Sequence, residues 1–477
     1  MNNRAKNQNG EVETRSPRSL LKRAFGSSGS SGKHSITNLS IYAFGLSGIW
    51  TGVGAGILPF KVLEALDAGR VEILGYSLDK NGALGIISLV GLGVAAAAQL
   101  GAGALSDRDS RLGSRLPYIL FGGVGLALIT VLLGMATSFV MLLLAIGAMQ
   151  MFANTGQGPA NALIVDHVPA QERGQAAGVL NLWRLIGAGS LTVIVLQFMA
   201  RYDAVESPEW LWYSIALMIV ALMTSVIWTV VATKPAGGLF FPALRSSSKW
   251  HKQRAQTAPS TPASPKAPIS RSYLAFLVAL GFATAAMSSM QIYALFFLQD
   301  VVGLDNPADG ADKLVVVIVL SAGLTVLPAG YLADRVGRTN MFIVAGATGI
   351  VSSLLLLFVS SIGPVLAVGV VVGIAVGLFI TLTWAVANSL VSQTSVAREL
   401  GYTSLATLGG AGVARFAGIG IDELNSVSVN LGYKALLIAV AIAFAVAAII
   451  LARITSTSGS VEVSSELEPA TTTPASD

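Results

Sequence analysis

Polar side chains gather in one otherwise apolar stretch, residues 154–174, which reads NTGQGPANALIVDHVPAQERG. The amides of Asn154, Gln157 and Asn161 can hydrogen-bond the hydroxyl groups of a small solute. Pro159 interrupts the backbone hydrogen bonds of any helix that contains it. One carboxylate, Asp166, closes the stretch. These residues are the first candidates for a binding site.

Two arginines lie inside long apolar runs, Arg184 in NLWRLIGAG and Arg415 in GGAGVARFAG. Arg184 is about 12 Å from the nearer end of its expected helix, at 1.5 Å per residue. An arginine in hydrocarbon costs about 2.5–3.5 kcal/mol on insertion scales, so each is expected to face a polar cavity. There the guanidinium group is expected to donate to hydroxyl groups of a solute or to pair with a carboxylate. The alternative is that the side chains extend to the membrane surface.

Aromatic and amide groups near the end of a later apolar run complete the candidates. Trp384 can stack on a ring of a solute and Asn388 can bond hydroxyls, the alternative being that both only pack between helices. The chain has three histidines, all in expected tails or loops, and no cysteine. We therefore expect no metal site, no cofactor and no enzymatic activity.

The segment 101–123, GAGALSDRDSRLGSRLPYILFGG, places five charges within nine positions. A second, shorter copy, GYLADRVGR, begins at residue 330. Aspartates at helix ends accept hydrogen bonds from neighbouring helix N-termini and pair with arginines, and glycines let helices approach closely. We interpret the two clusters as a gate, the alternative being basic patches that only set orientation. The gate residues are Gly103, Asp107, Arg108, Gly113, Arg115, Gly330, Asp334, Arg335, Gly337 and Arg338.

The elements that carry these residues are membrane helices. Of the 477 residues 53% are hydrophobic and 12% charged, and the mean hydropathy is +0.69. A soluble domain is roughly 25% charged, so lipid is the expected solvent. Runs of about 20 apolar residues cross a bilayer as helices. We predict an all-α membrane protein with twelve spans, at 38–63, 82–105, 117–137, 139–165, 176–200, 210–233, 272–298, 313–333, 339–361, 363–391, 402–422 and 430–453.

The distribution of Lys and Arg predicts the orientation. The loops on one side carry only Arg70, Lys80, Arg201, Lys313 and Lys434, whereas the tails and the other loops carry 22 Lys and Arg residues. Positive residues collect on the cytoplasmic side, so both termini are expected there, in a plasma-membrane protein. The net charge of +5 therefore reflects topology rather than nucleic-acid binding.

The domain plan follows from composition and from a repeat. GALSDR at 103–108 matches GYLADR at 330–335, and the same offset of 227 places ANALIV (160–165) over ANSLVS (387–392). Duplicated six-helix units are characteristic of secondary transporters. We predict two pseudo-symmetric six-helix bundles, 36–233 and 272–453. A basic cytoplasmic linker at 234–271 joins them, and disordered tails at 1–35 and 454–477 flank them.

The two charged clusters resemble the loop motif of the major facilitator superfamily, G-x-L-x-D-R-x-G-R-[RK]. The longer N-terminal copy resembles the sucrose and glycoside-cation symporters, although Ser114 and Leu116 replace two of their arginines. QGPANALIVD at 157–166 is similar to the sucrose transporters' Q-G-P-x-R-A-L-x-A-D, with Asn161 in place of the arginine. This resemblance implies that Asp166 takes up the proton that drives import. The other possibility is that Asp166 only caps its helix.

The resemblance implies the major facilitator fold, working as a monomer. It also implies proton-coupled symport of a sugar or glycoside by alternating access. The first alternative is a drug/proton antiporter. That class carries G-x(8)-G-x(3)-G-P-x(2)-G-G in its fifth helix, whereas this chain has RLIGAGSLTVIV without Gly-Pro. A non-transporting sensor or a polytopic membrane enzyme is the alternative from another class.

Overall fold

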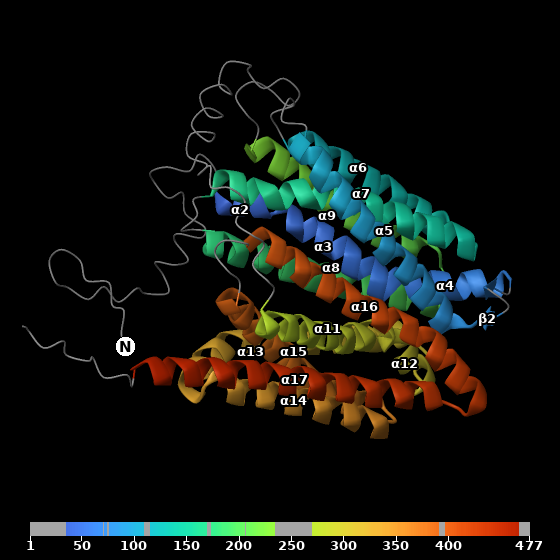
Figure 1. Cartoon of the computed structure of the whole chain (residues 1–477). Coiled ribbons are helices and arrows are strands. Elements are labelled where there is room, and N and C mark those ends of the chain that lie inside the picture. The colour runs from blue at the N-terminus through green and yellow to red at the C-terminus, as the bar shows by residue number, and fades with distance from the viewer. Residues whose placement is uncertain are drawn as a thin grey trace, which may run out of the picture.

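Long helices run side by side in a computed structural model that describes residues 35–69, 71–73, 76–108, 115–168, 173–205, 207–233, 270–390 and 396–466 (Figure 1). The elements of the first half are α2 Ile36–Ser40, α3 Tyr42–Gly52, the π-helix η1 Val53–Ile57, α4 Leu58–Asp67, β1 Val71–Ile73, β2 Tyr76–Leu78, α5 Lys80–Arg108, α6 Leu116–Met135, α7 Phe139–His167, α8 Arg173–Val205 and α9 Glu209–Thr233. Those of the second half are α11 Arg271–Ile292, α12 Ala294–Asp300, α13 Pro307–Val336, α14 Arg338–Leu355, the 3₁₀ helix η3 Leu356–Phe358, α15 Ile362–Leu390, α16 Val396–Val427 and α17 Leu431–Glu466.

Ten helical segments within the described residues are long and apolar enough to cross a membrane. They begin with Ile36–Asp67, which joins α2, α3, η1 and α4, and end with Leu431–Thr455. This confirms the predicted helical membrane protein. The helices α13 and α16 occupy the expected eighth and eleventh places but are not among the ten, so the count of twelve spans is not fully confirmed.

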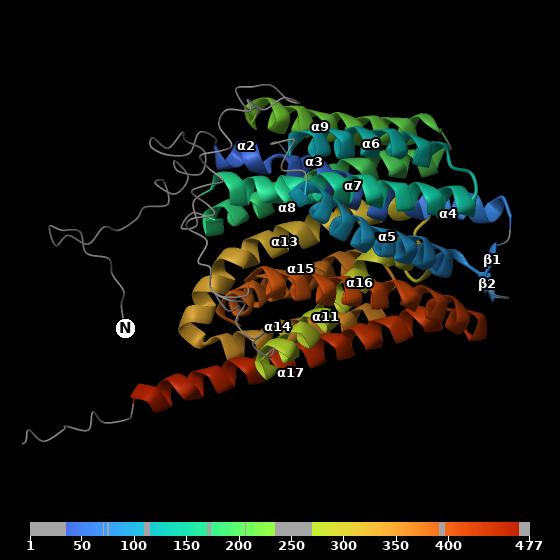
Figure 2. The same cartoon turned by 45° about the horizontal axis from the view of Figure 1, so that its top comes forward.

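Helices pack mainly within each half. In the first half α3 packs on α8 and α9, and α7 packs on α5 and α6. In the second half α15 packs on α13 and α14, while α17 packs on α11 and α14. The most extensive contacts between the halves join α5 to α16 and α8 to α13. Both pairs cross from one bundle to the other (Figure 2).

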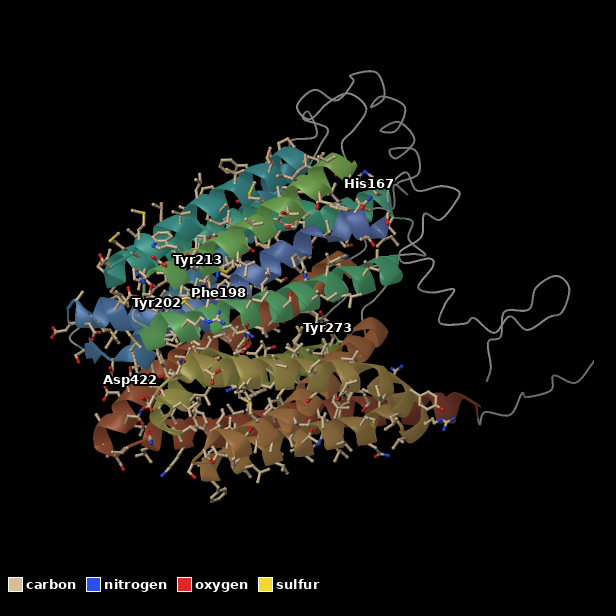
Figure 3. The ribbon with its side chains drawn as sticks, turned by 180° about the vertical axis from the view of Figure 1, so that it is seen from behind. His167, Phe198, Tyr202, Tyr213, Tyr273 and Asp422 are labelled. Atoms are coloured by element: carbon tan, nitrogen blue, oxygen red, sulfur yellow. The ribbon has the colours of Figure 1, made fainter. Side chains whose placement is uncertain are left out.

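The bundle has two ends, which differ in what they carry. We call the end at which α9 stops and α11 begins the linker face, and the end with the β1–β2 hairpin the hairpin face. His167 lies toward the linker face, whereas Tyr202 and Asp422 lie toward the hairpin face (Figure 3). The helices α5 and α13, which carry the two copies of the charged motif, both end at the linker face.

Two predicted boundaries differ from the structure. The expected helix 272–298 is split at Tyr293, whose φ and ψ of −96° and 4° end α11 before α12 starts. Helix α13 begins at Pro307 rather than at 313, because Asn306 caps it by accepting a hydrogen bond from Asp309 N at 3.2 Å. By contrast, α7 runs unbroken through Pro159.

Two further features were not predicted. Strands β1 and β2 pair antiparallel, with Val71 opposite Leu78, in the connection between the first two spans. Helix α17 continues to Glu466, although residues from 454 onward were expected to be disordered. Extending an existing helix costs no new nucleation, so a polar segment that follows a membrane helix can remain helical. The expected N-terminal tail and nearly all of the linker lie outside the described residues.

Candidate functional site

A cavity of about 420 Å³ lies between the two halves. Its first-half wall comes from α3, η1 and α8, including Thr51, Ala55 and Thr192. Its second-half wall comes from the α11–α12 junction and from α13, α15 and α17. A cavity of this size at a domain boundary is typical of small-molecule sites. We refer to it as the central cavity.

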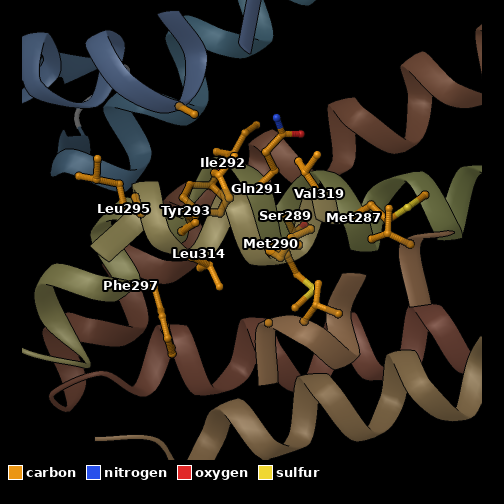
Figure 4. Close-up of a pocket in the computed structure, with 18 of the residues that line it drawn as sticks. Met287, Ser289, Met290, Gln291, Ile292, Tyr293, Leu295, Phe297, Leu314 and Val319 are labelled. Atoms are coloured by element: carbon orange, nitrogen blue, oxygen red, sulfur yellow. The ribbon is translucent and has the colours of Figure 1, made fainter. Parts of the chain in front are cut away.

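Apolar side chains line most of the central cavity, and its polar groups fall into two sets. Those of the first half are engaged with each other, since Thr192 Oγ1 donates to Thr51 Oγ1 at 2.7 Å. Ser289 and Gln291 lie on α11 beside the break at Tyr293 (Figure 4), and neither side chain hydrogen-bonds another described residue. Those two side chains are therefore available to a bound solute.

Tyr293 also fixes the shape of the second-half wall. It is 1% exposed, and its hydroxyl donates to the carbonyl oxygens of Ala414 and Arg415 on α16, at 3.1 and 3.0 Å. The break between α11 and α12 is thereby tied to α16, the helix that meets the first half. Movement of α16 is mechanically linked to the cavity wall.

A network of polar groups closes the hairpin face across the two halves. Lys80 Nζ pairs with Asp300 Oδ1 at 2.6 Å and donates to Gln299 Oε1 at 3.0 Å. Tyr433 donates its hydroxyl hydrogen to Asp300 Oδ2 at 2.7 Å or to Asn81 Oδ1 at 3.2 Å. Charge-assisted hydrogen bonds of this kind are stronger than neutral ones.

Asp422 completes this network from α16. Its carboxylate accepts from Asn81 Nδ2 at 2.9 Å and from Gly82 N at 2.6 Å. The first N–H groups of a helix have no partner within it, so Asp422 satisfies and electrostatically complements the start of α5. We call Lys80, Asn81, Asp300, Asp422 and Tyr433 the hairpin latch.

Glycines allow α5 and α16 to approach each other closely next to the hairpin latch. A Cβ at Gly85 would lie 2.3 Å from the carbonyl oxygen of Arg415, and one at Gly418 would lie 2.2 Å from that of Asn81. Neither position has room for a side chain without movement of the backbone. Small residues permit such close helix approach in membranes.

The hydrogen bonds between the halves are concentrated at one end. Within the described residues they include those of the latch, the Lys80–Gln299 bond, a bond from Asn306 Nδ2 to Ala200 O at 2.7 Å, and a side-chain bond between Gln197 and Asp312. All of them lie toward the hairpin face. The described part of the molecule is therefore joined at that end.

The structure brings three of the predicted binding residues together, but away from the central cavity. Arg184 Nη2 donates to Asn161 Oδ1 at 3.2 Å, and Gln157 lines the same small pocket inside the first half. Asn154 is buried and bonds Gln150 O one turn earlier on its own helix, at 2.8 Å. None of these four side chains lines the central cavity.

The remaining predicted residues lie on three other helix segments. Arg415 donates from Nη1 to Ala411 O at 2.7 Å, within α16, and does not line the central cavity. Asp166 is the penultimate residue of α7, and Trp384 and Asn388 lie near the end of α15. The side chains of these last three are outside the described part of the chain.

The gate residues are only partly described. The last turns of α5 contain Gly103, Asp107 and Arg108, and the end of α13 contains Asp334. The structure describes the backbone of these four residues but not their side chains. Gly113 lies outside the described residues. Arg115 precedes α6. Arg335 stacks on Tyr331 at 4.4 Å from the ring centroid, and Gly337, with φ of 93°, separates α13 from Arg338 at the start of α14. A Cβ at Gly330 would meet nothing within 4 Å, so no close helix approach occurs there in this structure.

Sequence reasoning missed the hairpin latch altogether. Asn81 and Asp422 are 341 positions apart, and no local motif connects them. One signal was present, because Asp300, Asp422 and Lys80 are charged residues close to the ends of apolar runs. Charged residues at such positions are equally typical of ordinary loops, so they do not indicate a contact between the halves.

Known structures show the same architecture. The chain is similar to a bacterial homologue of the human lysosomal transporter Spinster, in an inward-facing, unoccupied conformation, with a TM-score of 0.59 at 13% identity over 88% of this chain and 96% of that one. It is also similar to the peptide transporter POT in complex with sulfate (TM-score 0.64, 13% identity, 88% and 95% covered) and to the nucleoside transporter NupG (0.60, 14%, 88% and 98%). These likenesses concern the fold. No curated protein matches the sequence significantly.

Two bundles around a shared cavity define a secondary transporter of the major facilitator class, not an enzyme. Residues 78–397, more than half of the chain, match the family described as MFS/sugar transport protein. The chain belongs to that family.

Proposed function

We propose that this protein is a proton-coupled symporter that carries a sugar or glycoside by alternating access. The observation that carries the proposal is the central cavity, which lies between the halves and is closed off by the latch at one end only within the described residues. The family description, which names sugar transport, supports the same cargo.

The distribution of basic residues supports a cytoplasmic linker face and an external hairpin face. In that orientation we propose that the described helices represent an inward-facing state of a plasma-membrane protein. Opening requires the latch to break and the linker face to close, which is the role we propose for the two copies of the charged motif.

The cavity walls favour a cargo with both polar and apolar parts. Ser289 and Gln291 offer hydrogen bonds, whereas neighbours such as Met290 and Val319 offer apolar surface. A glycoside with an apolar aglycone meets both demands, since each buried hydroxyl needs a partner. The same apolar walls favour the second candidate, an antiporter that exports a hydrophobic compound.

Proton coupling rests on the resemblance of residues 157–166 to the sucrose transporters. In this proposal Asp166 binds the coupling proton near the linker face, where cytoplasmic release is direct. Asn154, Gln157, Asn161 and Arg184 act within the first half rather than on the cargo in the central cavity.

Uptake by proteoliposomes tests this function. A panel of labelled sugars and aryl glycosides is offered with and without an inward proton gradient, and the gradient is expected to drive accumulation of at least one of them. Proton-coupled symport is contradicted if the uptake rate is the same with and without the proton gradient, or if no sugar or glycoside is taken up. Expulsion of a hydrophobic dye in exchange for protons would favour the antiporter.

Asp166→Asn tests the coupling residue in the same assay. Without a titratable group, gradient-driven accumulation is expected to disappear while exchange of internal for external cargo continues. The control is His167→Gln, which changes the exposed neighbour that bonds Leu163 O of its own helix. If Asp166→Asn still concentrates the cargo, the coupling proton binds elsewhere.

A further inference from the structure

A second, much smaller cavity lies inside the first half. It has a volume of about 10 Å³ and is bounded by α2 and α3 on one side and by α7 and α8 on the other. That volume is close to the minimum that holds one water-sized particle. The cavity shares no lining residue with the central cavity, and it is too small for a sugar.

Two hydroxyl groups in this small cavity lack partners. Ser40 is 0% exposed and Tyr42 is 2% exposed, and neither Ser40 Oγ nor Tyr42 Oη has a hydrogen-bond partner in the described structure. Buried polar atoms are almost always paired, with protein or with a bound species. Two unpaired hydroxyls lining one cavity therefore point to an occupant.

Arg184 adds an unpaired positive charge to the same cavity. Its guanidinium group has five N–H donors, and within the described residues its side chain makes one hydrogen bond, to Asn161. Among the described side chains, none that lines the cavity is acidic and none forms an ion pair with Arg184. Arg184 is half-buried, and a charge that is partly withdrawn from water is stabilised by a counter-charge beside it.

The donor inventory identifies the kind of occupant. The guanidinium group, the two hydroxyls and the amide of Gln157 all offer hydrogens, and the oxygen of Asn161 is already engaged. A neutral water would satisfy some of these donors but would leave the charge uncompensated. We propose that this cavity binds one small monatomic anion, with chloride as the physiological choice, between Arg184, Tyr42 and Ser40.

Such an ion joins three segments of the first half. Tyr42 belongs to α3, Gln157 to α7 and Arg184 to α8, so one ion cross-links these three helices. Leu185, which follows Arg184, lines the central cavity. The ion thus stabilises the helix that forms one cavity wall without touching the cargo.

The test uses the purified full-length protein, prepared in gluconate so that no halide is present. Equilibrium dialysis with radioactive chloride is expected to show saturable binding of one ion per chain. Chloride at about 100 times its dissociation constant is expected to raise the apparent melting temperature by about 3 °C. Bromide is expected to compete with chloride, whereas sulfate is too large to enter the cavity.

Two variants and a control locate the site. Arg184→Gln is expected to abolish saturable binding, and its melting temperature is expected to be the same with and without chloride. Tyr42→Phe is expected to weaken binding about tenfold, because it removes one donor and leaves the ring in place. Arg415→Gln removes the other deep arginine, on α16, and is expected to bind chloride as the unmodified protein does.

Absence of saturable chloride binding by the unmodified protein would overturn the proposal and leave water as the occupant. Unchanged binding by Arg184→Gln would overturn the location, and competition by sulfate would overturn the monatomic size. None of these outcomes depends on which cargo is carried, so the chloride experiments test the anion site independently of the proposed transport function.

Discussion

At the scale of single residues, Asp422 is the group that most directly holds the halves together at the hairpin face. It accepts hydrogen bonds from Asn81 Nδ2 and Gly82 N, both in the other half. In Asp422→Ala these donors lose their partner while Asn81 remains 1% exposed. The closed hairpin face is expected to lose about 2 kcal/mol, which shifts its closed-to-open ratio roughly 30-fold.

Thiol labelling measures this shift. The chain has no cysteine, so Ala294→Cys in the central cavity provides a single target. On intact cells, an impermeant thiol reagent is expected to label this cysteine at least about tenfold faster when Asp422→Ala is also present. Glu423→Gln, which changes the exposed neighbour of Asp422, is the matched control. Equal labelling rates in all three proteins would mean that the hairpin latch does not hold the hairpin face closed.

At this scale the sequence marked Arg184, Asn161 and Gln157 separately as binding-site candidates. The structure places all three around one small cavity, which is not the one between the halves, so their role in binding stays a prediction. The latch was not predicted because its members come from α5, α12, α16 and α17, which meet only when the two halves pack together. A charge near a helix end gives no indication, in one sequence, of the partner 341 positions away.

At the scale of elements, the crossing of α5 and α16 determines how closely the halves approach. Gly85→Ala places a Cβ 2.3 Å from Arg415 O, so the two helices must separate. Each helix can still fold within its own half, and we expect intact protein with its uptake rate reduced about tenfold. Gly93→Ala, on the same helix, meets nothing within 4 Å and serves as the control. Equal uptake by the two variants would mean that this crossing is not used in transport.

Helix prediction worked because the bilayer imposes one length and one secondary structure on each apolar run. The break at Tyr293 was not predicted, because the segment after it, ALFFLQD, is mostly apolar and therefore resembles the continuation of the same helix. What ends α11 there is a tertiary hydrogen bond to α16, which the local sequence does not encode.

At the scale of the whole molecule, the two halves meet through a few surfaces that can separate. The duplicated motifs at the ends of α5 and α13 lie at the linker face, and the latch lies at the hairpin face. A repeat with an offset of 227 was readable from sequence, and so was the two-bundle plan that it implies. Which face is closed was not readable, because both states use the same helices.

Paired distance measurements test the rocking of the halves most directly. Ser77 on strand β2 and Ser428, directly after α16, are exposed on opposite halves. His167, which lies toward the linker face (Figure 3), and Asn340 in the first turn of α14 form the second exposed pair. Spin labels on cysteines at each pair, in a chain that has no others, report both ends of the molecule. On addition of a transported sugar with a proton gradient, we predict that the hairpin pair moves apart while the linker pair comes together. Distances that change in the same direction, or at one face alone, would contradict alternating access.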